Sequence, residues 1–202
     1  MNSSNKRPTS SDDTRQRLLV AAIEQIELHG LAKLTVRNVA AAAGANIAAV
    51  NYHFRSKDAL IEAALELSMA NALEHIDEIL ARIADAPEDV LSELFEHLLE
   101  GTLKYPQLGR ANLYGGFIND DYSGPFPRMF APVLVRLRDE LRAAVPGLDA
   151  RRAARRVTAA ISGVFFPPFF RGLFAEMEAL ASARERRSYA RELARAALAV
   201  PA

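Results

Sequence analysis

The sequence predicts an all-α protein, and three observations lead to that prediction. Alanine and leucine are abundant while the prolines cluster late in the chain, a composition that favours helix. Between Val90 and Leu103, pairs of mostly apolar residues such as Leu94-Phe95 recur every four positions, which is the spacing of one helix face. No segment alternates apolar and polar residues with the period of two that a half-buried strand has.

Composition excludes several classes of protein. Hydrophobic residues make up 50% and charged residues 25% of the 202 residues, as in ordinary globular proteins. The chain has no cysteine, which rules out disulfides, thiolate zinc sites and cysteine nucleophiles. No apolar stretch approaches the roughly 20 residues that cross a bilayer, and the first thirteen residues lack the apolar core of a secretory signal. We expect a cytoplasmic protein with no membrane partner.

The charge is unevenly distributed although the formal net charge is zero. Residues 1–60 carry eight Lys and Arg against five Asp and Glu, and residues 61–202 carry seventeen against twenty. This mild asymmetry permits an N-terminal third that faces nucleic acid.

The N-terminal part predicts a flexible arm at residues 1–12, with Lys6 and Arg7, followed by a short three-helix unit. A first helix runs from Asp13 to about His29, where Gly30 ends it. Thr35 caps a second helix that ends at Gly44, and Asn46 caps a third. The expected inward residues are Leu19, Ala22, Ile23 and Ile26, then Val36, Val39, Ala40 and Ala43, then Ile47, Val50 and Phe54.

The remaining residues predict a larger helical domain. Ser56 caps a long fourth helix that continues through Leu60, Ala64 and Leu67 to about Ile83. Pro87 interrupts the pattern, and Pro106 ends the helix that holds the four-residue repeat. The Pro167-Pro168 pair is expected to kink or end its helix. The helices expected after Pro87 lie at about 90–103, 107–118, 126–145, 149–166 and 184–199, with a loop from Asn119 to Pro127.

Two short helices joined by a tight glycine turn have the outline of a helix-turn-helix. Arg37 lies in the first turn of the second helix and Lys57 at the start of the fourth, although helix N-termini ordinarily prefer acidic residues. Cations at these ends make sense if each faces a phosphate. The outer face of the third helix consists of Asn46, Ala48, Ala49, Asn51, Tyr52 and His53.

Small alanines let a helix lie deep in a major groove, and an alanine can contact a thymine methyl group. Asn51 could read an adenine or bind a phosphate, and Tyr52 and His53 could reach backbone oxygens. From these residues alone, a solvated polar helix face is an equally good interpretation.

The stretch from Gly30 to Leu60 decides between these interpretations. Its motif is Gly30, then Leu34-Thr35, then Val39-Ala40 with Ala43-Gly44, then Val50-Asn51-Tyr52-His53-Phe54 with Ser56-Lys57 and Leu60. Residues 13–62 carry this pattern and resemble the DNA-binding domain of the TetR/AcrR-type repressor family. The family often has Ser at the position of Asn46, Gly or Pro around Ala48-Ala49 and Tyr at Asn51, and these departures bear on base preference.

The resemblance implies a helix-turn-helix over residues 13–58 and a domain for dimerisation and effector binding over residues 59–202. It implies a homodimeric, ligand-responsive repressor whose partners are a pseudo-palindromic operator in double-stranded DNA, a second copy of the chain and a small molecule. The aromatic residues described below favour an apolar or aromatic small molecule. The residues that it places near DNA are Thr35, Arg37, Asn46, Ala48, Ala49, Asn51, Tyr52, His53 and Lys57.

Two apolar stripes are candidates for the dimer interface, because long helices with small residues can pack closely in a four-helix bundle. The alternative is that both stripes close the core of one chain. The candidate residues are Ala153, Val157, Ala160, Ile161 and Val164 on one helix, and Leu193 and Ala196 on the last.

Aromatic residues concentrate in the second half of the chain, which would suit the lining of an apolar pocket. An aromatic stripe can equally be plain core, and the Phe165–Phe170 run could line a cavity or an interface. The candidate ligand-binding residues are Tyr105, Tyr114, Phe117, Phe130, Phe165 and Phe169.

Competing functions have weaker support. Glu93 and His97 could be two metal ligands, but no third ligand has suitable spacing, and no motif for hydrolysis or phosphate binding is present. We therefore expect no catalytic residue, no metal and no cofactor. A helical adaptor without DNA binding is the alternative, and it would leave Arg37, Lys57 and the alanine-rich face without a purpose.

Overall fold

The computed structural model describes residues 11–199, and every regular element in that range is a helix. The predicted arm therefore lies almost wholly outside the described residues, and its last two positions belong to the first helix. The helices are α1 Ser11–His29, α2 Val36–Ala42, α3 Ile47–Phe54, α4 Lys57–Leu73, α5 Ile76–Leu80, α6 Pro87–Lys104, α7 Pro106–Asn119, α8 Pro125–Ala144, α9 Ala150–Phe169, α10 Arg171–Phe174 and α11 Ala183–Leu198, with 3-10 turns at Leu31–Lys33 and Ala175–Met177.

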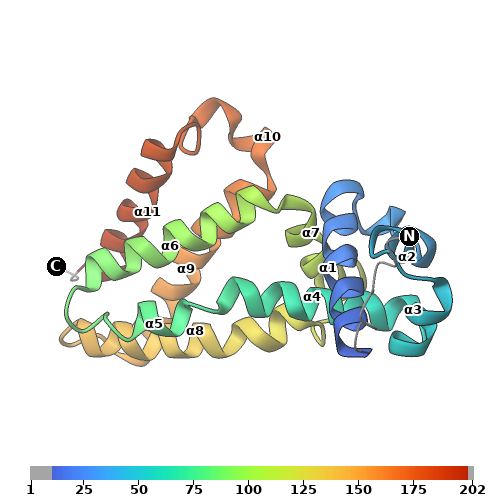
Figure 1. Ribbon diagram of the computed structural model, residues 1–202. Helices are drawn as coiled ribbons and strands as arrows, with labels where there is room; N and C mark the ends of the chain where they lie inside the picture. Colours follow the sequence, from blue (N-terminus) through green and yellow to red (C-terminus); the bar gives the residue numbers. More distant parts are fainter. Residues whose placement is uncertain (1–10, 200–202) are drawn as a thin grey trace, which may run out of the picture.

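The molecule is elongated, with a small head formed by α1, α2 and α3 at one end (Figure 1). Helix α4 runs from the head into the larger helical domain, where α5, α6, α8, α9 and α11 pack together. Helix α7 lies at the junction, beside α1 of the head. The all-α prediction is confirmed.

Three of the predicted N-caps are present, whereas Asp13, the predicted start of the first helix, lies inside α1. The side chains of Thr35, Asn46 and Ser56 accept hydrogen bonds from the free backbone N–H groups of Asn38, Ala49 and Ala59, at 3.1, 2.8 and 3.0 Å. Each bond satisfies a donor that the first turn of a helix leaves unpaired. Local sequence therefore fixes where α2, α3 and α4 begin.

The prediction that the fourth helix continues to Ile83 is wrong. Helix α4 ends at Leu73 and α5 begins at Ile76. The first half of α4 packs in the core of the head, whereas Ile76, Ile79 and Leu80 face the core of the helical domain. The break between α4 and α5 lets the buried face of the chain turn from the core of the head to the core of the helical domain.

The prediction that Pro167-Pro168 ends or kinks its helix is also wrong in position. Helix α9 continues through both prolines to Phe169, and the chain turns by 98° only at the start of α10. Proline has no N–H, so Pro167 leaves the carbonyl of Gly163, four residues earlier, without its helical partner. The hydroxyl of Tyr189 on α11 donates to that carbonyl at 2.9 Å.

A Tyr189→Phe substitution should therefore lower the free energy of unfolding by about 1 kcal/mol, measured by urea denaturation. Tyr105→Phe is the matched control, because Tyr105 is exposed and its hydroxyl has no such bond to any of residues 11–199. Burial, with the Glu192 carboxylate nearby, raises the pKa of Tyr189. Its contribution should be complete below the unfolded pKa of about 10 and be lost as pH rises through the higher folded value. Equal stability of the two variants would contradict this account.

Two hydrophobic cores hold the molecule together. The core of the head contains side chains from α1, α2 and α3, with Leu60 and Ala64 from α4 and Leu108 and Ala111 from α7. The core of the helical domain is built around Phe95 and its neighbours on α6. Because α4 and α7 reach the core of the head while belonging to the larger domain, the predicted boundary at residues 58 and 59 falls where packing is continuous.

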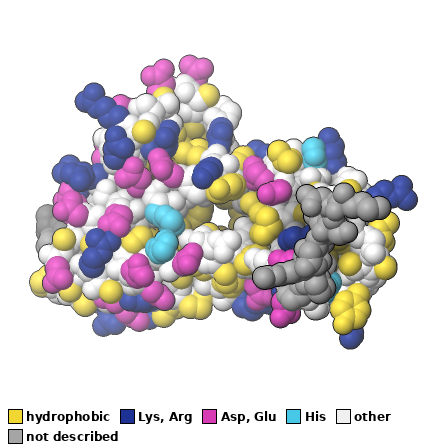
Figure 2. All heavy atoms as spheres, in the orientation of Figure 1, with side chains coloured by type: hydrophobic (Ala, Val, Ile, Leu, Met, Phe, Trp, Pro, Cys, Tyr) yellow, Lys and Arg dark blue, Asp and Glu magenta, His cyan; other side chains and the backbone are white. Residues whose placement is uncertain are grey.

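Ion pairs join α6 to α11 along their exposed sides. The pairs are Glu88–Arg195, Asp89–Arg191, Glu96–Arg187 and Glu100–Arg186. Acidic and basic side chains accordingly lie close together on the upper left of Figure 2. Much of the charge on α11 is therefore paired within the chain.

Among the described residues, no single helix has the length and apolarity of a membrane span. One pair bent by 98°, Ala150–Phe169 with Arg171–Met177, meets that criterion by length and composition only.

Candidate nucleic-acid interface

The turn between α2 and α3 is held in place from α1. Gly44 adopts a positive φ of 61°, a conformation that glycine reaches without strain. The guanidinium of Arg17 donates to the carbonyl of Ala43 at 3.1 Å and also contacts Thr14 and Asp13. Arg17 therefore fixes the angle between the two helices from behind the turn.

Helix α3 presents a small, polar outer face. Val50 and Phe54 are buried as predicted, and Ala48, Asn51 and Tyr52 are exposed. Tyr52 is 77% exposed, and its ring lies edge-on to the ring of His53, with 5.1 Å between the ring centroids. Ala49 and His53 are half-buried. The predicted DNA-facing residues of α3 thus share one accessible surface.

Ile47 differs from the prediction. It was expected to point inward, but it is 42% exposed. The residue follows the Asn46 cap directly, so it lies at the edge of the core where no neighbouring helix covers it. Ile47 therefore adds an apolar side chain to the accessible surface of α3.

Cations surround this surface. Arg37 is exposed in the first turn of α2, and Lys57 is exposed at the first position of α4. Arg55, which the sequence interpretation did not select, is exposed between α3 and α4 with a φ of 61°. None of the three makes an ion pair within the described range of 11–199. A basic residue directly before the Ser56 cap was the signal that could have identified Arg55.

The caps limit what two other candidates can do. Thr35 Oγ1 and Asn46 Oδ1 each accept a backbone N–H of their own helix. The Thr35 hydroxyl proton and the Asn46 amide N–H groups are the atoms that could act as donors to DNA. Both residues are exposed.

Glu27 ties the head to the helical domain. Its carboxylate accepts the backbone N–H groups of Gln107 and Leu108 at 3.1 and 3.0 Å. Pro106 opens α7 and has no N–H, so Glu27 satisfies the first donors that α7 offers. A charged acceptor at a helix N-terminus also interacts favourably with the helix dipole. The position of α7 is therefore mechanically linked to α1.

The candidate ligand-binding residues divide into two groups. Phe130 is buried, and the ring of Phe165 lies 5.5 Å from Phe130 and 6.4 Å from Phe169. Phe126 completes this aromatic cluster, 5.3 Å from Phe130; its i, i+4 spacing from Phe130 was the available signal. Tyr105, Tyr114 and Phe117 lie elsewhere on the surface, at 44%, 50% and 71% exposure.

Most of the candidate dimer residues lie inside one chain. Ala153, Val157, Ala160 and Val164 are buried in the core of the helical domain, and Ile161 and Leu193 pack against it. Ala196 is exposed. The buried stripe of α9 is thus occupied by intrachain packing, which was the alternative reading of the sequence. The accessible face of α9 is formed by Ala154, Thr158, Ala159, Ser162 and Phe166.

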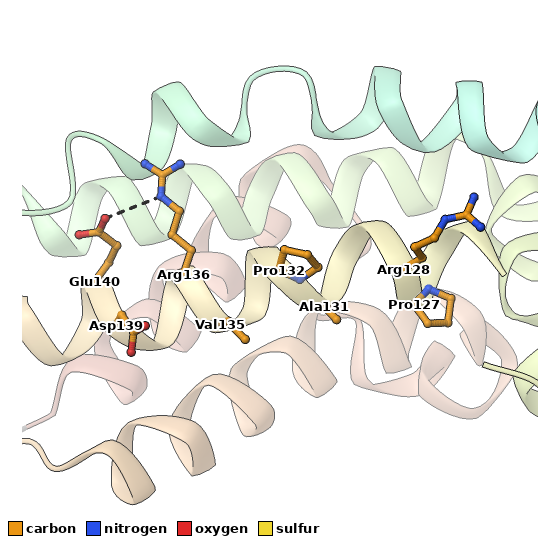
Figure 3. A pocket seen from close by; sticks show the side chains of 8 residues that line it. All are labelled: Pro127, Arg128, Ala131, Pro132, Val135, Arg136, Asp139 and Glu140. Carbon is orange, nitrogen blue, oxygen red and sulfur yellow. Dashed lines mark ion pairs between the residues drawn. The ribbon is translucent and has the colours of Figure 1, made fainter. Parts of the chain in front are cut away.

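An open groove of about 780 Å³ runs along α8 (Figure 3). All of its lining residues, from Pro127 to Glu140, come from this one helix. Arg136 pairs with Glu140 at 3.7 Å and also with Asp77, and Arg128 pairs with Glu66 at 3.1 Å. The groove contains none of the aromatic candidates.

Glu93 and His97, the two side chains considered as metal ligands, have other partners. Both carboxylate oxygens of Glu93 accept from Arg82, at 2.7 and 2.8 Å, and His97 Nε2 faces the carbonyl of Ala72 at 3.1 Å. In the described part of the chain, no three His, Asp or Glu side chains cluster as metal ligands would.

Comparisons with known proteins agree with the geometry of the head. Residues 18–64 match the model of the family described as bacterial regulatory proteins, tetR family. The HTH-type transcriptional regulator AcrR of Shigella flexneri is 32% identical over 98 residues, which are 48% of this chain and 46% of AcrR. The regulator BetI 2 of Chromohalobacter salexigens is 28% identical over 172 residues, 75% of each chain. The match to AcrR thus spans less than half of that relative's own length.

Solved structures share the whole fold. A transcriptional regulator from Rhodococcus sp. Rha1 aligns with a TM-score of 0.71 at 21% identity, covering 93% of this chain and 99% of that one. RolR in complex with resorcinol aligns with a TM-score of 0.55 at 17% identity, covering 92% and 87%. The N-terminal domain of this chain, residues 18–64, therefore matches the tetR family of bacterial regulatory proteins, and the whole chain shares the all-helical fold of the solved regulators.

Proposed function

We propose that this protein is a transcriptional repressor that binds a pseudo-palindromic operator as a homodimer and leaves it when a small molecule binds. The observation that carries the proposal is the surface of the head. Exposed Arg37, Arg55 and Lys57, free of ion pairs among residues 11–199, lie around a helix whose outer face bears small or polar side chains together with the exposed Tyr52 and Ile47. Such a helix fits a major groove while the cations hold the phosphates.

Two copies of the chain are needed to read the two half-sites of such an operator. Their recognition helices would lie roughly 34–36 Å apart. We propose that the copies pair through the accessible faces of α9 and α11, where Ala154, Thr158 and Ser162 permit close approach. A four-helix bundle is the simplest two-fold arrangement of these helices. The predicted interface thereby moves to the neighbouring face of α9 and keeps Ala196.

Pairing through α9 can be tested with Ser162→Arg. An arginine on this face should place two charges against each other across the two-fold axis and convert the dimer into a monomer, as measured by light scattering after size-exclusion chromatography. Val135→Arg, on the exposed face of α8, is the control and should leave the dimer intact. Dissociation by Val135→Arg alone would assign the interface to α8 and refute the proposal.

Operator binding can be tested on a duplex selected by the protein from random sequence. Arg37→Ala and Lys57→Ala should each weaken binding several-fold and reduce the slope of log affinity against log salt by about one. Arg184→Ala removes the same charge from an exposed site on α11 and should change neither quantity. Fluorescence anisotropy between about 50 and 200 mM salt covers the useful range. Salt-independent association would contradict phosphate contact.

The effector would act by favouring a dimer geometry in which the heads no longer match the operator. A ligand shifts such an equilibrium only through different affinities for the two states. The aromatic cluster of Phe126, Phe130, Phe165 and Phe169 lies within the helical domain, and α7 connects that region to the head. Resorcinol, the ligand of the structurally similar RolR, supports a small aromatic effector.

A further inference from the structure

We propose that the effector carries a hydrogen-bond donor on an otherwise apolar or aromatic body, and that Asn112 Oδ1 accepts that donor. This inference rests on the proposed ligand-responsive function and specifies the chemistry of its ligand. It begins from a polar atom that the fold leaves unpaired. Asn112 Oδ1 is buried and has no hydrogen-bond partner among the described residues.

The orientation of the Asn112 amide follows from its surroundings. The amide nitrogen donates to the carbonyl of Leu108 at 3.1 Å. Because a carbonyl can only accept, the nitrogen must be the atom that faces Leu108, and the oxygen must point away from it. The free atom is therefore an acceptor, and its partner must supply an N–H or O–H group.

The position of Asn112 on α7 places this acceptor between two packed faces. Leu108 and Ala111 belong to the core of the head. On the other side, a β-carbon at Gly109 would meet the ring of Phe169 at 2.7 Å, and one at Gly116 would meet Tyr122 at 3.2 Å. With 3.6 residues per turn, Asn112 lies about 40° around the helix from each of Leu108 and Gly116. Asn112 therefore lies between the face of α7 that packs in the head and the face that meets Phe169 and Tyr122.

The surroundings make an unpaired oxygen significant. By contrast, the buried hydroxyl of Thr102, whose side chain packs against Gly109 of α7, is paired: it donates to the carbonyl of Leu98 at 2.9 Å within α6. Buried polar groups are almost always hydrogen-bonded, so an exception calls for a partner. The face shown in Figure 2 is hollowed near its middle, where Figure 1 places α4, α6 and α7, and hydrophobic side chains lie on the rim. A mainly apolar ligand with one donor matches this combination.

Asn112 is also hydrogen-bonded to Leu108, the residue that joins α7 to the head. The carbonyl of Leu108 accepts from the Asn112 amide nitrogen, and the N–H of Leu108 donates to Glu27 of α1. A ligand held by Asn112 is therefore linked, through the Leu108 carbonyl, to the first turn of α7, which Glu27 ties to the head. The same contact that recognises the ligand can thus affect operator binding.

Two matched pairs of probes test this inference on the full dimeric protein: phenol with toluene, and indole with benzothiophene. Within each pair the shape is similar and only the first member has a donor. Calorimetry should show that the donor-bearing probe of at least one pair binds about tenfold or more tightly than its partner, because the other leaves the acceptor unsatisfied. In Asn112→Leu this preference should disappear, while the protein keeps its helical content and its operator affinity without probe.

Asn119→Leu is the control, because Asn119 is exposed at the end of α7, and it should keep the preference. The bound donor probe should also weaken operator binding by wild type and not by Asn112→Leu. Equal binding within both pairs, no binding of either donor probe, or an unchanged preference in Asn112→Leu would each overturn the inference. Operator binding is measured on the same samples, so its loss in probe-free wild type would count against the proposed function instead.

Discussion

Replacing Ala48 with glutamate is expected to weaken operator binding by at least about 100-fold, the largest effect on binding of any single change considered. Ala48 is exposed in the first turn of α3 and lies on the same side as Tyr52. In a major groove this face would approach base edges and phosphates closely. A glutamate there adds both bulk and a negative charge, and juxtaposed like charges cost several kcal/mol, where about 1.4 kcal/mol is a factor of ten.

Two variants separate charge from size and from general effects. Ala48→Gln has nearly the same shape as Ala48→Glu without the charge, and it should retain part of the affinity. Ala81→Glu adds the same charge at an exposed position beyond α5, far from the head (Figure 1), and should bind as wild type does. Anisotropy titrations at one fixed salt concentration give all three values. Wild-type affinity in Ala48→Glu would exclude α3 from the DNA interface.

The head could be predicted from sequence because its determinants are local. Thr35, Asn46 and Ser56 each cap a helix through a bond to a residue three positions later. The buried positions Val50 and Phe54 follow the helical period, and the stop at Gly44 requires only its own positive φ. Residues within a few positions therefore decide where these helices begin and end, although the angle between α2 and α3 also depends on Arg17 of α1.

The helical domain could be predicted only in outline, because its details depend on contacts between distant residues. Helix α9 passes through two prolines because a tyrosine from α11 satisfies the carbonyl that Pro167 leaves free. Which face of α9 is buried depends on α6, α8 and α11, which cover Ala153 and Val157. Periodicity identifies an apolar stripe, but the same stripe can serve a core or an interface.

The aromatic residues illustrate the same limit. Phe130 and Phe117 look equivalent in sequence, yet one is 3% and the other 71% exposed. The unpaired oxygen of Asn112 could not be predicted from the sequence either, because an asparagine in a helix gives no sign of which partners its side chain has. In the structure the amide nitrogen donates to the Leu108 carbonyl, and the oxygen has no partner among the described residues.

Phe95→Ala should produce the largest loss of stability, about 3–5 kcal/mol. Phe95 is 1% exposed on α6 and is among the largest fully buried side chains. Its removal leaves a cavity lined by side chains that other helices hold in place, so the loss includes both the transfer of the ring to water and the lost packing. For a chain of this size the melting temperature should fall by roughly 6–20 °C.

Phe117→Ala is the matched control, since the same atoms are removed from a side chain that is 71% exposed, and its effect should stay within about 0.5 kcal/mol. Urea denaturation followed by circular dichroism measures both variants. Hydrogen exchange tests a further consequence: because α4 and α7 pack into the core of the head, Phe95→Ala should also increase exchange in α1. Faster exchange confined to α6 and the helices around it would show that the head unfolds independently and that α7 does not couple the two cores.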